Sequence, residues 1–370
     1  MDFTLSDEQV ALKDSVERFV ADEHGFEHAQ IHAASAEGFS RRDWASFADL
    51  GWLMLLVPED LGGLGCGLID AALLMEGFGR GLVAAPYVSS AVLAPRLLAR
   101  AETPGDHAAL IEQIAGGQTI VALATEEAGS NFDPRIVAAE ASATLGGHVL
   151  NGAKLIVPDG AAADHFLVSA RLDGRTALFL VAANASGLTV RPYRTIDQRR
   201  ACDLGFSAVP AMLVIADAAD AIDCAVDEAS LMLAAEAVGC MHAALDMTAD
   251  YLKTREQFGR TLSKFQVLTH RIAEMYVKLE NARSMLLRGL AAADAPRDPR
   301  AAAVSATMVT IIQASEFICG QAIQLHGGIG MTQETAVGHY YKRIRAIART
   351  YGDLEYHRRR HLQRTQRRAA

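Results

Sequence analysis

The chain has 370 residues, of which 51% are apolar, and its formal net charge is -9, from 35 lysines and arginines and 44 aspartates and glutamates. This length and composition leave room for two or three domains and a large hydrophobic core, which excludes an intrinsically disordered chain. The acidic balance argues against a general nucleic-acid-binding surface.

Cysteine usage and the N-terminus indicate where the protein works. The N-terminal MDFTLSDEQV has no basic region followed by an apolar one, and no apolar run approaches the length of a membrane span. The cysteines are scattered, odd in number and without a C-x-x-C pair, which is typical of reduced cytosolic thiols and predicts no metal site. We therefore expect a soluble, cytoplasmic protein without membrane association. The five cysteines are Cys66, Cys202, Cys224, Cys240 and Cys319.

Residues 1 to about 118 show mostly helical patterns. An apolar stripe follows Ser6, a candidate N-cap, and Leu68–Leu82 and Ser89–Ala101 also have helical spacing. Pro58–Gly67 (PEDLGGLGCG) is dense in glycine but does not satisfy G-x-G-x-x-G after a strand. We interpret it as a loop, so a dinucleotide-binding fold is not supported.

The pattern changes near Gly116, where short runs rich in β-forming residues begin. Gly, Asn, Asp and Pro separate these runs, as expected for strands joined by turns. Seven short strands at this spacing predict a small antiparallel barrel or sandwich. The runs are Thr119–Ala124, His148–Leu150, Phe166–Ala170, Thr176–Val181, Leu188–Pro192, Asp203–Phe206 and Met212–Ile215.

From Asp217 the pattern returns to helix, so the order helix, sheet, helix predicts an α+β architecture. Two long helical patterns flank Tyr251–Gln266 (YLKTREQFGRTLSKFQ), and Gly259 interrupts the pattern between them. Arg255 and Phe258 are then expected near the end of one helix, where a guanidinium and a ring can hold a phosphate and a flat heterocycle. The alternative is a solvated arginine and a core phenylalanine.

The C-terminus carries a basic tail within an otherwise acidic chain. One interpretation is a solvated helix end, where cations suit the helix dipole. The other is attraction to phosphates or to a partner protein. The tail comprises Arg358–Arg360, Arg364, Arg367 and Arg368.

The T-R-x-x-F-G segment and four further stretches, in the same order along the chain, resemble the acyl-CoA dehydrogenase family. The resemblance implies an N-terminal helical domain (1–118), a middle antiparallel β-barrel or sandwich domain (119–217) and a C-terminal helical bundle (218–370). The further stretches are Asp2–Gln9 (DFTLSDEQ), Leu50–Gly63 (LGWLMLLVPEDLGG), Ala122–Ser130 with Leu150–Lys154 (ALATEEAGS, LNGAK), and Ala322–Gly330 (AIQLHGGIG).

The resemblance also implies FAD as cofactor and an acyl-CoA thioester as substrate. In the family a carboxylate takes a proton next to the carbonyl, and the flavin takes the neighbouring hydrogen as hydride. Thr125 matches a residue that touches the flavin pyrimidine ring, and Ser130 one near the substrate. The positions matching the flavin contacts that a neighbouring subunit contributes are Arg255, Phe258, Gln324, Gly327 and Gly328.

The chain departs from the family at the catalytic base. Gly352 stands where most members carry the glutamate of a Y-E-G motif, and Ala229 stands where a second branch has its base. Asp353 and Glu228 are each one residue away, and a shift of one residue on a helix turns a side chain by about 100°. Glu236 is a third candidate, although a carboxylate in an apolar helix needs a partner to be buried.

The middle domain departs as well. Ile156 and Pro158 replace a Trp and a Thr that lie close to the flavin ring, and the loop Glu126–Gly129 is one residue shorter than the common E-P-G-A-G. Proline offers neither an N–H nor a hydroxyl. The positions that in the family contact the subunit's own flavin are therefore altered, while those that contact the flavin of a neighbouring subunit are retained.

This combination resembles the small, non-catalytic subunit of bacterial heteromeric acyl-CoA dehydrogenases that act on steroid side chains or dicarboxylic acids. It implies a homologous larger subunit in an α2β2 assembly and an electron-transferring flavoprotein as acceptor. Two alternatives stay open. One is a homo-oligomer that uses Asp353 or Glu228 as base, and the other is a structural partner that has lost flavin.

Overall fold

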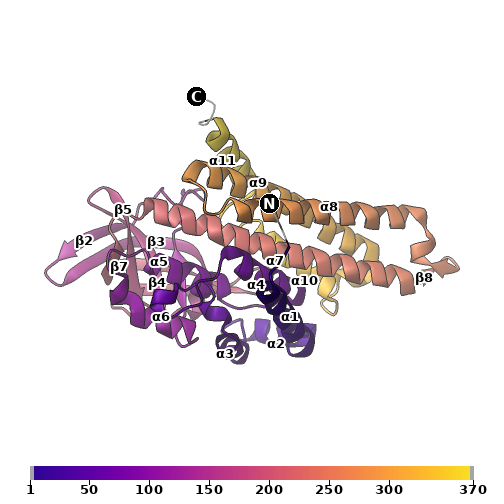
Figure 1. The fold of residues 1–370 in the computed structure, drawn as a ribbon, viewed down its shortest axis with the longest axis horizontal. Helices are drawn as coiled ribbons and strands as arrows, with labels where there is room; N and C mark the ends of the chain where they lie inside the picture. Colours follow the sequence, from indigo (N-terminus) through magenta and orange to yellow (C-terminus); the bar gives the residue numbers. More distant parts are fainter. Residues whose placement is uncertain (1–3, 367–370) are drawn as a thin grey trace. The chain divides into compact units, whose positions relative to one another are not determined.

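The computed structural model describes residues 4–366. Asp2 and Phe3 of the N-terminal stretch, and Arg367 and Arg368 of the basic tail, lie outside the described residues. Two compact units form: the first contains the described residues up to Gln30, Ala72–Val83 and those from Ser230 onward, and the second contains Ile31–Ala71 and Ala84–Ala229. The predicted order helix, sheet, helix is confirmed (Figure 1). The domain boundaries at 118 and 217 stay a prediction.

The chain enters α1 (Asp7–Asp22) through the predicted N-cap. Ser6 Oγ accepts the Gln9 amide at 3.2 Å, and the Gln9 side chain accepts the Ser6 amide at 3.2 Å. This capping box satisfies two amides that have no partner inside the helix. The other helices before the sheet are α2 (Phe26–Ala34), α3 (Arg41–Asp49), α4 (Leu68–Gly81), the π-helix Tyr87–Leu93, α5 (Ala94–Leu98) and α6 (Ala108–Ala115).

The middle of the chain forms one seven-stranded sheet in the second unit. Pairing follows the order β1-β4-β2-β3-β7-β5, and β5 also pairs with β4, so β4, β2, β3, β7 and β5 close into a barrel-like circuit. Phe166 and Phe179 lie fully buried inside it. The strands are β1 (Val121–Ala124), β2 (Glu140–Thr144), β3 (Gly147–Pro158), β4 (His165–Leu172), β5 (Arg175–Ala182), β6 (Leu188–Arg194) and β7 (Arg200–Ile215).

Three details of this sheet differ from the prediction. Strand β2 was missed because Glu140–Thr144 is almost wholly exposed and lacks an alternating apolar pattern. The last two predicted strands are one continuous strand, β7, which runs through Pro210. The pairs β1–β4 and β2–β4 are parallel, so the sheet is not purely antiparallel.

Long helices dominate the first unit, which includes α7 only from Ser230 onward. Helices α7 (Ala219–Thr254) and α8 (Gln266–Ala291) are joined by the short hairpin of β8 (Glu256–Gln257) and β9 (Arg260–Thr261), visible at one end of the helix pair (Figure 1). They are followed by α9 (Arg297–His326), the 3-10 turn η7 (Gly327–Met331), α10 (Ala336–Ile347) and α11 (Leu354–Gln366).

Within this unit α4 and α7 cross with their backbones in contact. A Cβ atom on Gly79 would lie 2.0 Å from the Glu236 carbonyl oxygen, and one on Gly239 would lie 1.9 Å from that of Glu76. Only glycine permits so close an approach. Because the axes are this close, polar side chains beside the crossing are brought into contact.

Helix α9 is more apolar than the sequence analysis recognised. Among residues 4–366, one helical stretch, Arg297–Met331, is long and apolar enough to span a membrane, and 67% of its most apolar window is buried inside the structure. Burial of that extent is expected for a core helix. The statement that no apolar run approaches the length of a span was therefore wrong.

The basic tail is not simply a solvated helix end. Arg358 and Arg359 are exposed, but Arg360 and Arg364 are 6% and 4% exposed. The guanidinium of Arg364 lies 2.7 Å from a carboxylate oxygen of Asp298 on α9. The solvated interpretation is wrong for these two residues because both are buried, and the ion pair of Arg364 with Asp298 anchors α11 to the unit.

Candidate functional site

The ends of α7 and α9 meet in the first unit. The rings of Tyr251 and His326 stack with centroids 4.4 Å apart and an angle of 20° between their planes. Arg255 follows Tyr251 by one helical turn, and Gly327 follows His326 directly. The stack therefore places two predicted flavin-contact segments, far apart in sequence, next to each other.

The predicted flavin-contact residues at this junction are open to solvent. Arg255 and Gln324 are exposed, and within residues 4–366 no ion pair engages the Arg255 guanidinium. A Cβ atom on Gly327 or Gly328 would meet nothing within 4 Å. A free guanidinium, a primary amide and bare glycine backbone form a donor set that suits a phosphate ester.

Phe258 lies just beyond the end of the helix. Helix α7 ends at Thr254, and Phe258 occupies the turn of the β8–β9 hairpin with φ of 56°. Gly259 follows it with φ of 76°, so two consecutive left-handed residues reverse the chain. Phe258 is 88% exposed, which excludes the core interpretation. Within the described residues its ring meets that of Phe265 edge-on, with centroids 6.1 Å apart.

Thr125 and Ser130 lie in the second unit, on the loop that follows β1. Both are buried, at 3% and 1% exposure. The Ser130 hydroxyl donates to Glu126 Oε2 at 2.8 Å. Burial raises the pKa of Glu126, opposed by the Ser130 hydrogen bond and the Lys154 charge. In this conformation the hydroxyl proton of Ser130 is engaged within its own loop rather than presented to a substrate.

An ion pair beneath this loop holds it to the sheet. Lys154 Nζ, which is fully buried, contacts Glu127 Oε1 at 2.5 Å, Ser169 Oγ at 2.8 Å and the Thr125 carbonyl at 3.4 Å. The three ammonium protons thus have three acceptors. Desolvation lowers the pKa of Lys154, and the Glu127 carboxylate opposes that effect.

Gly352, at the first of the two family base positions, is tightly enclosed. Its φ is 145°, and a Cβ atom would lie 2.5 Å from His357 Nε2 and 2.6 Å from Tyr356 Cδ1. His357 is 1% exposed, and burial, with the charge of Arg360, lowers its pKa to about 3, so the ring is neutral. No side chain fits at position 352 unless these rings move.

Asp353, the neighbouring candidate base, already has a structural role. Its Oδ1 accepts the Tyr356 amide at 2.8 Å, just before α11 begins at Leu354. This is the N-cap arrangement that aspartate favours. A helix cap explains the aspartate without catalysis, and its role as base stays a prediction.

Glu228, beside the second base position, is paired through both oxygens. Arg96 donates to its two carboxylate oxygens at 2.7 Å each, and Arg100 adds a contact of 3.3 Å. Its side chain is 3% exposed, and Ala229 is completely buried. Lone pairs directed at two guanidinium groups are not available to a substrate proton, which weighs against Glu228 as base.

Glu236, the third candidate, is completely buried and has the partner that such burial requires. Arg343 on α10 donates from Nε to Oε1 at 2.7 Å and from a terminal nitrogen to Oε2 at 2.6 Å. The arginine is itself 9% exposed. This bidentate pair ties α10 to α7 and leaves no free carboxylate oxygen facing a substrate.

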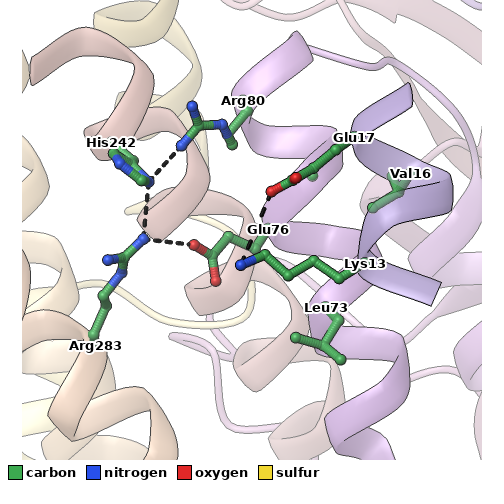
Figure 2. Close-up of a pocket in the computed structure, with 9 residues that line it drawn as sticks. Lys13, Val16, Glu17, Leu73, Glu76, Arg80, His242 and Arg283 are labelled. Carbon is green, nitrogen blue, oxygen red and sulfur yellow. Dashed lines mark hydrogen bonds and ion pairs between the residues drawn. The ribbon is translucent and has the colours of Figure 1, made fainter. Parts of the chain in front are cut away.

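A second polar cluster, beside the glycine crossing, was missed by sequence reasoning. Arg80 and Arg283 both approach His242 Nδ1, at 2.5 and 2.8 Å, and Arg283 also donates to Glu76 at 2.9 Å (Figure 2). Desolvation and the two guanidinium charges lower the pKa of His242, so the ring accepts both hydrogen bonds as a neutral group. Asp246 contacts Arg80 at 3.3 Å, which further balances the charges.

Hollows of about 40 and 570 Å³ adjoin this cluster. None of the residues predicted to contact flavin or substrate lines either hollow, so the cluster is not the predicted site. No sequence signal could have found it, since Arg80 and His242 are 162 residues apart in the chain.

Comparisons with known proteins agree with the fold. The family model described as "Acyl-CoA dehydrogenase, N-terminal domain" matches residues 6–118, and "Acyl-CoA dehydrogenase, C-terminal domain" matches residues 220–365. The acyl-CoA dehydrogenase FadE27 of Mycobacterium tuberculosis is 29% identical over 353 residues, which cover 92% of each chain.

Solved structures match over nearly the whole length. A chain of the Tcur3481-Tcur3483 steroid ACAD superposes with a TM-score of 0.90 and 29% identity, covering 99% of both chains. A chain of the ChsE4-ChsE5 complex from Mycobacterium tuberculosis gives 0.88 and 28% over 97% of both chains. The FAD complex of PigA gives 0.88 and 25% over 100% of both chains.

Proposed function

Because the chain belongs to the acyl-CoA dehydrogenase family, we propose that it is a subunit of an FAD-dependent acyl-CoA dehydrogenase that supplies flavin contacts, while a companion subunit supplies the catalytic base. The reaction is the α,β-dehydrogenation of an acyl-CoA thioester. The proposal combines an open donor set at the Arg255 junction with a closed base position at Gly352.

The observation that carries the proposal is the enclosure of Gly352. A general base must reach within hydrogen-bond distance of the proton that it removes. A carboxylate side chain at position 352 would begin with its Cβ 2.5 Å from His357 Nε2. The neighbouring carboxylate of Asp353 caps α11, so the usual base position and its nearest substitute are both used for structure.

The junction of α7 and α9 supports FAD as the cofactor. Arg255 would hold the pyrophosphate, with Gln324 and the backbone of Gly327 and Gly328 beside it, and Phe258 would pack against the nucleotide. When bound, the flavin would accept the hydride that leaves the substrate's β-carbon. This chain's own residues would orient the nucleotide through charge-assisted hydrogen bonds. The FAD complex of PigA, which shares the fold over its full length, supports this assignment.

Substrate and assembly follow by analogy with relatives. The Tcur3481-Tcur3483 protein is named as a steroid ACAD, and ChsE4-ChsE5 is a complex of two chains. We propose a homologous larger dehydrogenase as partner in an α2β2 assembly and a steroid side-chain acyl-CoA as substrate. We also propose an electron-transferring flavoprotein as the electron acceptor and a cytoplasmic location. Both rest on the family resemblance alone.

Co-expression with a homologous larger subunit that retains Y-E-G tests this function. We expect the chain alone to show no turnover with steroid side-chain acyl-CoA thioesters, and the co-purified complex to carry yellow flavin and turn over. Turnover by the chain alone would contradict the proposal and favour the homo-oligomeric alternative. A complex with no flavin contact to this chain would favour the structural alternative.

A further inference from the structure

The two helix ends that carry the proposed nucleotide contacts are connected through one pair of rings. Tyr251 lies in the last turn of α7, and His326 is the last residue of α9. Their rings stack with centroids 4.4 Å apart, although Tyr251 and His326 are 75 positions apart in the sequence. Among the described residues no hydrogen bond links Arg255 directly to the Gly327 turn, whereas this stack joins the two helix ends that carry them.

Tyr251 controls the position of Arg255 through its backbone. The Tyr251 carbonyl accepts the Arg255 amide at 2.8 Å and the Thr254 hydroxyl at 3.2 Å. These bonds close the last turn of α7 and fix where the chain leaves the helix. A shift of the Tyr251 backbone, which the stacked ring restrains, would therefore move the Cα atom from which the Arg255 side chain extends.

His326 controls the glycine turn in the same way. Its Nδ1 donates to the Ala322 carbonyl at 2.8 Å, which locks the ring plane, and the residue is 7% exposed. The next amide, that of Gly327, bonds to the carbonyls of Gln324 and Ile323. Desolvation lowers the pKa of His326, so the ring stacks as a neutral imidazole. The imidazole is thus anchored to α9 before the chain turns at Gly327.

We propose that Tyr251 and His326 are positioning residues that hold Arg255 and the Gly327–Gly328 turn at the spacing needed for one FAD pyrophosphate. This inference rests on the proposed function. The guanidinium and the turn would both contact this one anionic group, so a change of about 1 Å in their separation would remove a contact without removing a donor. Neither ring is among the groups proposed to contact the cofactor.

Paired substitutions separate positioning from chemistry. Tyr251→Phe and His326→Phe keep a ring at each position, whereas Tyr251→Leu and His326→Ala abolish the stack. An aromatic pair contributes enough that its loss should raise the FAD dissociation constant of the assembled protein about threefold to tenfold. We expect the two Phe variants to stay within about twofold of wild type. Tyr276→Leu, which removes an exposed ring on α8, is the matched control.

A double-mutant cycle identifies the route of the effect. If the stack acts through Arg255, adding His326→Ala to Arg255→Ala should change the FAD dissociation constant far less than His326→Ala does alone. Hydrogen exchange at the Arg255 amide, measured on flavin-free protein, should be faster in Tyr251→Leu and unchanged in Tyr276→Leu. This second readout does not depend on bound flavin or on activity.

The outcomes distinguish this inference from the proposed function. Additive effects of the two substitutions in the cycle would overturn the positioning role alone. The same conclusion would follow if His326→Ala kept the wild-type FAD affinity while Arg255→Ala bound FAD more weakly. If this chain made no contribution to FAD binding in the wild-type complex, the proposed function itself would be overturned. A general loss of folding is recognised because it would lower the melting temperature of His326→Ala and His326→Phe alike.

Discussion

The enclosure of Gly352 predicts a large penalty for the smallest possible side chain. Gly352→Ala places a Cβ 2.5 Å from His357 Nε2 and 2.6 Å from Tyr356 Cδ1, at φ of 145°. Overpacking in a well-packed region costs ~1–3 kcal/mol, and a residue held in an unfavourable backbone region costs a further ~1–3 kcal/mol. We therefore expect Gly352→Ala to lower the free energy of unfolding by about 2–6 kcal/mol.

Urea unfolding of the purified chain measures this penalty, with Gly320→Ala as the matched control. Gly320 lies inside α9, and a Cβ there meets nothing within 4 Å. The control should be neutral or stabilising by ~0.5–1 kcal/mol, because alanine has the higher helix propensity. If Gly352→Ala unfolds at the same urea concentration as Gly320→Ala, position 352 can accept a side chain and the reasoning about the closed base position is wrong.

Four further predictions concern charge and catalysis. Arg255→Ala should weaken FAD retention by the assembled protein roughly tenfold or more, because a charge-assisted hydrogen bond contributes ~1.5–3 kcal/mol; fluorescence of released flavin measures this. Asp353→Asn should leave turnover of the complex within a few-fold, whereas loss of a true base would cost about 10²–10⁴-fold. Arg343→Met should destabilise the chain by ~3–5 kcal/mol in urea, because Glu236 is then buried without its partner. Finally, burial and a neighbouring guanidinium hold the pKa of His357 at about 3, below the ~6.5 of an unfolded histidine. The unfolded chain therefore binds the proton first, and the stability contributed by this site is complete above pH ~6.5 and lost as the pH falls towards 3; His357→Gln should flatten that pH dependence.

Sequence patterns predicted the element order because period and turn residues are local properties. The N-cap at Ser6 and the helical pattern over Leu68–Leu82 depend on neighbours a few residues away, and both are confirmed. Strand β2 could not be found this way, because its pairing with β3 rather than any apolar alternation holds it in place. The continuity of β7 through Pro210 likewise depends on its long partner β3.

At the site, residue identities could be predicted from motifs, but their contacts could not. Nothing in the sequence shows that Glu236 meets Arg343, since 107 residues separate them. The obstruction at Gly352 depends on a backbone angle and on the direction of His357, neither of which a motif specifies. The hairpin that carries Phe258 follows the end of α7 at Thr254 and spans only a few residues, too few to show a sequence pattern of its own.

Anaerobic flavin reduction tests the central claim most directly. FAD is supplied first to the chain alone and then to the chain co-purified with a larger subunit that retains Y-E-G, and each sample is mixed with a steroid side-chain acyl-CoA. The account predicts that the visible flavin band bleaches only in the complex, and that the bleaching slows when Arg255→Ala replaces the wild-type chain. Bleaching by this chain alone would show that it carries its own base and would contradict the account.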